Sequence, residues 1–188
     1  MRRADLIQLL EAHEGSTALE RRYGEEMRAL VEAEGDPFAR NNYLPGHFTC
    51  SAFVLSPTLD ALLLIYHSKL HRWLQPGGHV DEEDVDVVAA ARREVLEETG
   101  VADLRLLDGR ILFDLDIHHI PARPKEVGHA HFDLRFLFVA PSLEATAGSD
   151  AVDYQWVDLQ EVSQLESDAS VMRAVEKLTL RADLFPSA

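Results

Sequence analysis

The sequence contains a single cysteine, Cys50, among its 188 residues. A disulfide within the chain is therefore excluded, which fits a reducing compartment. The sequence also lacks an apolar run of the roughly 18–20 residues that a helix needs to cross a bilayer. Residues 1–15 begin with a basic pair, turn acidic at once and contain no apolar segment typical of a signal peptide. We therefore expect a cytoplasmic protein without a membrane partner.

Basic residues are scarce, because 18 Lys and Arg stand against 33 Asp and Glu, and the formal net charge is −15. Such a surface repels a polyanion, so general nucleic-acid binding is not expected. A small anionic substrate remains compatible with this charge, because a bound metal ion is often the largest local charge in a site. Apolar residues make up 46% of the chain, which is typical of a globular domain with its own core.

The N-terminal part of the sequence has a helical pattern. Residues 1–33 carry apolar side chains at helical spacing, and Ser16-Thr17 is suited to cap a second helix. We expect an N-terminal helical extension over residues 1–45. Its leucine-rich stripe needs burial, so we predict that it packs against the β core. A dimer interface, and hence a homodimer, or a lid over the site are the alternatives.

Residues 46–188 have the pattern of one domain in which short strands flank a central helix. The expected elements are strands at 49–55, 61–66, 104–117, 129–139 and 154–157, a turn at 73–78, a loop at 118–128, and helices at 85–99 and 168–180. This order predicts a mixed α/β domain of sandwich type, in the α+β class.

Glu94, Glu97 and Glu98 follow the spacing i, i+3 and i+4 on the predicted central helix. At 3.6 residues per turn, the three carboxylates share one face within an arc of roughly 100°. Like charges at this spacing destabilise a helix unless solvent or a counter-charge compensates them. Mg²⁺ prefers oxygen ligands and binds substrate phosphates beside one or two carboxylates. The arc is therefore either a solvated acidic face or a site for a divalent cation.

Three neighbouring features favour the cation site. Val88, Ala91 and Val95 form an apolar stripe beside the glutamates, so the carboxylates border the core. Gly100 ends the helix directly after the cluster. A Pro-Gly-Gly turn at residues 76–78 precedes the helix, and its backbone can approach a ligand that a side chain would exclude.

The segment GGHVDEEDVDVVAAARREVLEETGV, residues 77–101, resembles the signature of the Nudix family, G-x5-E-x7-R-E-U-x-E-E-x-G-U, where U is aliphatic. The second half matches at every position. In the first half, Asp84 stands where glutamate is expected and lies nine rather than eight residues before Arg93. Either Glu83 or Asp84 takes the part of that glutamate. Flanking features extend the resemblance over about residues 49–162.

The resemblance implies a Nudix-type α/β/α sandwich with a mixed β-sheet, and a hydrolase that acts on phosphorus anhydrides. It implies a Mg²⁺ or Mn²⁺ ion held by Glu94, Glu97, Glu98 and the backbone carbonyl of Gly78. It also implies that Arg93 orients the glutamates. The implied substrate is a nucleoside diphosphate linked to a moiety X, such as ADP-ribose, a nucleotide sugar or a modified nucleotide.

A carboxylate near the metal is needed to take the proton from the attacking water. Glu94 is the first choice as base or base-ligand. Some family members use a carboxylate of a later loop instead, for which the candidates are Glu144, Asp150 and Asp153. The alternative interpretation of each is a solvated acidic loop residue.

Four polar residues alternate along one face of the predicted strand 129–139: His129, His131, Asp133 and Arg135. We take His131 and Asp133, together with Gly78 and His79, as candidate substrate-binding residues. A zinc site made of two or three histidines plus Asp133 is one alternative. A solvated or hydrogen-bonded strand face is the other.

Two further functions fit the same signature. A Nudix-like domain that binds a nucleotide without hydrolysis usually lacks glutamates of the metal helix, whereas this chain keeps all three. An isomerase of the isopentenyl diphosphate type needs an added cysteine and glutamate, but Cys50 lies in a segment typical of a buried strand. We therefore predict a hydrolase. The identity of X is not specified by the signature, because specificity lies in loops outside it.

Overall fold

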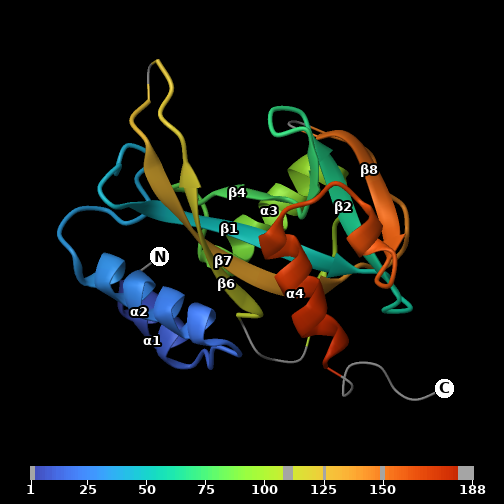
Figure 1. Ribbon diagram of the computed structural model, residues 1–188, viewed down its shortest axis with the longest axis horizontal. Helices are drawn as coiled ribbons and strands as arrows, with labels where there is room; N and C mark the ends of the chain where they lie inside the picture. The colour runs from blue at the N-terminus through green and yellow to red at the C-terminus, as the bar shows by residue number, and fades with distance from the viewer. Residues whose placement is uncertain (1–2, 108–111, 125, 149–150, 182–188) are drawn as a thin grey trace. The chain divides into compact units, whose positions relative to one another are not determined.

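The computed structural model describes residues 3–107, 112–124, 126–148 and 151–181. Its elements are α1 (Arg3–Glu11), α2 (Ala18–Glu32), β1 (Gly46–Leu55), β2 (Ala61–His67), β3 (Arg72–Leu74), β4 (Gly77–His79), α3 (Val87–Thr99), β5 (Arg105–Leu106), β6 (Asp114–Ile120), β7 (His129–Val139), β8 (Ala151–Asp158), the 3₁₀ turn η1 (Val162–Gln164) and α4 (Ala169–Thr179). The expected combination of a β-sheet with separate helices is confirmed (Figure 1). Among these residues, no helix is both long enough and apolar enough to cross a membrane.

The strands form one eight-stranded sheet in the order β3-β2-β1-β7-β5, in which β4 pairs with β1, β6 with β7 and β8 with β2. The chain divides into two compact units. Unit 1 contains residues 1–51, 78–91 and 111–136, and unit 2 contains residues 52–77, 92–110 and 137–188. Strands β1, β4 and β7 and helix α3 each continue from one unit into the other.

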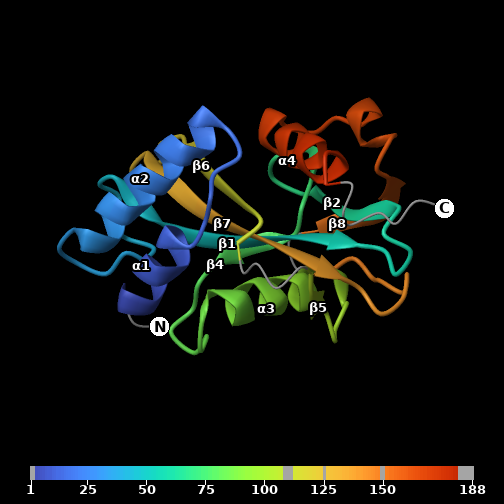
Figure 2. The same cartoon turned by 90° about the horizontal axis from the view of Figure 1, so that it is seen from below.

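In unit 1, α1 and α2 lie side by side in both views (Figures 1 and 2), and α2 packs on β6. The predicted packing of the N-terminal helices against the β core is thus confirmed. The buried face of α2 consists of five residues: Glu20, Gly24, Met27, Leu30 and Val31. Leu19 precedes that face by one residue and is 36% exposed.

The start of α2 is fixed by a reciprocal cap. Thr17 Oγ1 accepts a hydrogen bond from the Glu20 amide at 3.1 Å, and Glu20 Oε2 accepts one from the Ser16 amide at 2.7 Å. These two bonds satisfy amide groups that a helix start leaves without partners. The predicted role of Ser16-Thr17 is confirmed, and Glu20 is almost fully buried beside His13.

The second half of unit 1 is a long hairpin of β6 and β7, in which Asp114 lies opposite Arg135 and Ile120 opposite His129. Strand β7 has the predicted bounds of 129 to 139. The single strand predicted over 104–117 is wrong, because β5 ends at Leu106 and β6 begins only at Asp114. The predicted start of the loop at residue 118 is also wrong, because β6 stays paired with β7 as far as Ile120.

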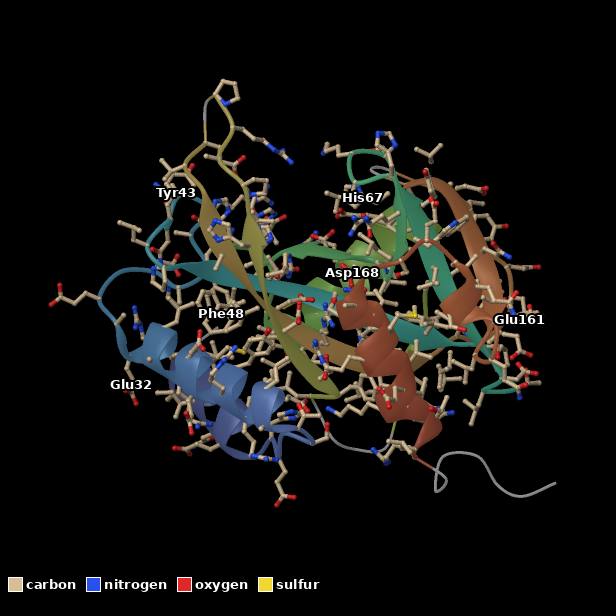
Figure 3. All side chains as sticks on the ribbon, in the orientation of Figure 1. Glu32, Tyr43, Phe48, His67, Glu161 and Asp168 are labelled. Carbon is tan, nitrogen blue, oxygen red and sulfur yellow. The ribbon has the colours of Figure 1, made fainter. Side chains whose placement is uncertain are left out.

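In unit 2, β2 pairs antiparallel with β1, β3 and β8, and it runs beside β8 in Figure 1. The predicted hairpin of β1 and β2 is confirmed. The stretch 73–78, predicted as a turn, contains parts of β3 and β4, because Trp73 pairs with Tyr66. Helix α4 begins after Asp168, whose side chain accepts from the amides of Ser170 and Val171 (Figure 3). Its predicted apolar stripe, Val171, Ala174, Val175 and Leu178, is buried.

Helix α3 begins two residues later than the predicted start at residue 85. Asp86 accepts a hydrogen bond from the Ala89 amide at 2.7 Å, so it caps the first turn. Val85 precedes this cap and is 79% exposed. Further along, Ala91 and Val95 are fully buried, which confirms that this part of the apolar stripe faces the core. Val88, the first residue of the predicted stripe, is only half-buried, and Val87 is buried instead.

Candidate active site

The three glutamates of α3 differ in their exposure to solvent. Glu98 is 4% exposed, and the side chains of Glu94 and Glu97 are 12% and 50% exposed. The arc therefore passes from the protein interior to the surface. A buried carboxylate such as Glu98 is expected only where hydrogen bonds or a counter-charge compensate its loss of water.

Part of that compensation comes from the glycine turn. The Gly77 amide donates a hydrogen bond to Glu98 Oε2 at 2.9 Å. The bond joins the Pro-Gly-Gly segment to the last turn of α3, two segments that the sequence placed near each other only by its signature. Gly78 follows in β4 and is half-buried.

Arg93 lies against the outer part of the arc. Its Nη1 donates to Glu94 Oε1 at 2.9 Å and lies 3.4 Å from both carboxylate oxygens of Glu97. One guanidinium thus bridges two carboxylates that would otherwise repel each other. This is the contact that the family resemblance implies for Arg93.

The loop before β8 closes on the end of α3. The Thr146 amide donates to the Thr99 carbonyl at 2.8 Å, and the Gly148 amide donates to the Glu98 carbonyl at 2.9 Å. A Cβ atom at Gly148 would lie 2.2 Å from the Glu97 carbonyl oxygen. Only glycine allows this approach. The sequence does not indicate this contact, since a single glycine in a loop carries no distinguishing pattern.

The later carboxylates considered as general bases lie in different settings. Glu144 is exposed in the loop before β8. Asp153 is exposed on β8, where its Oδ1 accepts from the Tyr154 amide at 2.8 Å. Asp150 lies outside the described residues. Glu94, the first choice, contacts Arg93.

These observations can be compared with known proteins. A family model described as NUDIX domain matches residues 47–178. The chain belongs to the Nudix family. As a member, it is a hydrolase that acts on diphosphate bonds.

Two rodent enzymes and several solved structures are similar to this Nudix chain. The asymmetrical bis(5'-nucleosyl)-tetraphosphatase of Mus musculus is 29% identical over 111 residues, which cover 57% of this chain and 70% of that protein. The enzyme of the same name from Rattus norvegicus is 31% identical over 111 residues, which again cover 57% of this chain and 70% of that protein. A C. elegans Ap4A hydrolase binary complex superposes with a TM-score of 0.55 at 18% identity, over 73% of this chain and 98% of that one. RenU, a Nudix hydrolase from M. smegmatis, superposes with a TM-score of 0.55 at 16% identity, over 83% of this chain and 99% of that one. At these identities the solved structures show a shared fold alone.

The first half of the Nudix signature forms a turn in unit 1. Asp84 Oδ2 accepts from the Asp81 amide at 2.8 Å, and the Asp84 amide donates to the Asp81 carbonyl at 3.1 Å. Glu83 is exposed. Asp84 therefore closes the turn that leads into α3, and the residue that replaces the family's first glutamate stays a prediction.

A second group of polar side chains lies in unit 1, where the rings of five histidines gather. His47 is stacked on His79 and on His129, with ring centroids 5.2 and 5.0 Å apart. His131 lies 4.8 Å from His47 and 5.2 Å from His79. His118 reaches His131 at 5.3 Å from the more exposed strand β6. We call these five residues the histidine cluster.

Burial keeps the inner imidazoles neutral. Loss of solvent is the largest cause that lowers the pKa of His47, and it lowers the pKa of His79 to about 4 and that of His131 to about 2. Repulsion from neighbouring charged groups, among them His118 for His131 and Arg40 for His79, acts in the same direction. Neutral imidazoles can each offer one nitrogen lone pair.

Asp133 belongs to a buried ionic network, and His118 of the histidine cluster contacts that network through Asp116 Oδ2, 3.3 Å from its Nδ1. Its Oδ1 accepts from Thr49 Oγ1 at 3.1 Å, and its Oδ2 accepts from Ser51 Oγ at 2.7 Å and from Arg135 Nε at 2.9 Å. Arg135 also contacts Asp114 at 3.3 Å and Asp116 at 3.2 Å. Burial disfavours the charged guanidinium, but these three aspartates outweigh it and raise the pKa of Arg135.

The polar face predicted on β7 therefore consists of two parts. His129 and His131 lie in the histidine cluster, whereas Asp133 and Arg135 form a buried ionic network. Sequence alternation correctly placed the four side chains on one face. It gave no sign that Asp114 and Asp116 of β6 complete the network, because that contact depends on the register of the hairpin.

Proposed function

We propose that this Nudix hydrolase is a Mg²⁺- or Mn²⁺-dependent pyrophosphohydrolase that cleaves the diphosphate of a nucleoside diphosphate linked to a second moiety. The observation that carries the proposal is the carboxylate arc of α3, in which Glu98 is buried and Glu94 nearly so. Hard divalent cations prefer such oxygen donors. A carboxylate has about four lone-pair positions, so the bond that Glu98 accepts from Gly77 is compatible with metal ligation.

The donor set fits the ion that the family implies. Glu94, Glu97 and Glu98 would hold it, and the carbonyl of Gly78 is proposed as a further ligand. A bound divalent ion neutralises charge on the diphosphate oxygens and makes a bound water more acidic. Arg93 keeps the carboxylates of Glu94 and Glu97 together by its two contacts.

The chain itself supplies the proton acceptor, the support of the glutamates and the substrate contacts. We propose that Glu94 takes the proton from the attacking water, with Glu144, Asp150 and Asp153 as alternatives. Gly148 supports the arc because its amide binds the carbonyl of Glu98 and fixes the end of the helix. The substrate contacts of His79, His131 and Asp133 stay predictions.

The substrate is to be found with a panel of nucleoside diphosphate derivatives. The panel contains ADP-ribose, a nucleotide sugar, an oxidised nucleoside triphosphate and a dinucleoside tetraphosphate, the last because it is named in the mouse and rat relatives. Each compound is incubated with Mg²⁺ or Mn²⁺, and the products are separated by chromatography. We expect a nucleoside monophosphate and a phosphorylated second moiety from at least one compound.

Two variants test whether hydrolysis requires the glutamates of α3. Glu94→Gln removes the proposed base and should reduce turnover by about 10²–10⁴-fold. Glu98→Gln keeps the side-chain shape but removes a charge from the arc, so turnover should collapse while nucleotide binding survives. Glu161→Gln is the matched control, because Glu161 is exposed in the turn after β8 (Figure 3). Nucleotide binding without turnover of any compound, unchanged by Glu98→Gln, would favour a regulatory binding domain instead.

A further inference from the structure

The histidine cluster contains a buried nitrogen that no described residue satisfies. His47 is 1% exposed, and its Nε2 has no hydrogen-bond partner among the described residues. Its other nitrogen, Nδ1, lies 3.2 Å from the Asn42 carbonyl oxygen. A carbonyl oxygen can only accept, so Nδ1 carries the proton and Nε2 presents a bare lone pair. A buried acceptor of this kind is unfavourable unless something binds it.

Two neighbouring histidines offer ligand atoms to the same place. One ligand nitrogen from each of His47, His79 and His131 can be chosen so that all three lie within 4.8 Å of one another. The three residues come from β1, β4 and β7, so the backbone of three strands fixes their relative positions. We propose that His47, His79 and His131 form a second metal site, which takes a zinc-type transition-metal ion through neutral imidazoles.

His129 extends this donor set. Its Nδ1 lies 2.8 Å from the Val127 carbonyl oxygen, so its Nε2 also presents a lone pair. That Nε2 lies 3.3 Å from His131 Nε2. Zinc–nitrogen bonds of about 2.0–2.1 Å at a tetrahedral angle place two ligand nitrogens about 3.3 Å apart. The His129–His131 pair already has this separation.

The contacts around the histidines suit a metal site. Metal-binding histidines usually donate their second N–H to a carbonyl or carboxylate, which fixes the tautomer and the ring. His47 and His129 do so toward the backbone carbonyls of Asn42 and Val127.

The ligand chemistry separates this site from the carboxylate arc. Imidazoles suit zinc, copper and nickel, whereas carboxylates suit magnesium and manganese. Asp133 is not needed as a ligand, since both of its oxygens accept hydrogen bonds from the buried network. The chain would thus bind a hard cation at the glutamates and a borderline cation at the histidines.

Titration of ZnCl₂ into the metal-free, full-length protein tests the proposal. The titration is performed in excess Mg²⁺, which occupies the carboxylate arc. We expect one equivalent of zinc to bind to the wild type and to Glu98→Gln. His79→Gln and His131→Gln should each weaken zinc binding by at least about tenfold. His119→Ala is the control, because His119 lies on β6 next to the cluster but is exposed, and its zinc affinity should not change.

Two further measurements keep the test decisive. Circular dichroism in chelator shows whether each variant is folded, and His47→Phe replaces a ligand by a ring of similar shape if a glutamine variant unfolds. Crystals of the zinc complex should give an anomalous peak at the zinc edge beside His47, His79 and His131. The proposal is overturned if zinc does not bind, if binding is lost in Glu98→Gln, if it survives the histidine substitutions, or if the peak lies at the glutamates.

Discussion

Replacing Arg135 by methionine should lower the free energy of unfolding by about 3–5 kcal/mol. Arg135 is 1% exposed, and its three aspartate partners are at most 3% exposed. Each pair, at 2.9–3.3 Å, is attractive by about 5 kcal/mol at an effective dielectric constant near 20, before the loss of solvation is subtracted. Methionine fills much of the same space but leaves three buried carboxylates without their cation.

The stability of the Arg135→Met variant is measured by urea unfolding at neutral pH. For a domain of this size, the predicted loss corresponds to a fall of about 6–20 °C in the melting temperature. Arg135→Lys is the matched control: it keeps the charge but loses the planar group that reaches three acceptors, so its loss should be smaller. The deficit of the methionine variant should shrink as the pH is lowered, because protonation neutralises the stranded aspartates.

A methionine variant that equals or exceeds the wild type in stability would refute this reasoning. Such a result is known for buried ionic groups whose desolvation outweighs their attraction. It would mean that the network sets the hairpin register of β6 and β7 without stabilising the fold.

Four other predictions follow from single contacts. Gly148→Ala should reduce turnover and stability, because its Cβ would collide with the Glu97 carbonyl, whereas Ala147→Ser, an exposed neighbour, should change neither in the same assays. Asp168→Ala removes the cap of α4 and should lower the urea midpoint by the equivalent of about 1 kcal/mol, and an unchanged midpoint would contradict the cap. Deleting residues 1–44 exposes the surface that α2 covers and should cause aggregation in light scattering, so a soluble, active truncation would defeat that view. In the metal-free protein, burial holds the pKa of His79 near 4 and that of His131 near 2. As the pH falls below about 6.5, the histidines of the unfolded chain therefore bind protons before those of the folded chain, and the free energy of unfolding should decrease. Urea midpoints that stay constant between pH 7 and 5 would contradict this.

The periodicity of apolar and polar residues predicted helix α3 and strand β7, which contain most of the candidate site residues. The buried stripe of α3 and the bounds of β7 depend on periodicity within one segment, which the sequence displays directly. The start of α3 was missed by two residues, since several acidic residues precede the helix and only the structure identifies Asp86 as its cap.

Long-range contacts account for what the sequence could not predict. His47 gave no signal of its own, because its neighbours come from strands that pair far along the chain. The same holds for the partners of Arg135 on β6, whose register is set by the hairpin as a whole. Gly148 was missed because the approach of its loop to α3 is a tertiary contact.

The proposed activity requires that the glutamates of α3 bind a hard divalent cation. The direct measurement is anomalous diffraction from crystals of the full-length protein soaked in Mn²⁺, with Glu98→Gln crystals as the comparison. We predict a manganese peak within ligand distance of Glu98 and Glu94 in the wild type, and a weaker peak or none in the variant. A wild-type map without a peak at these carboxylates, under conditions in which the enzyme cleaves its substrate, would contradict the account.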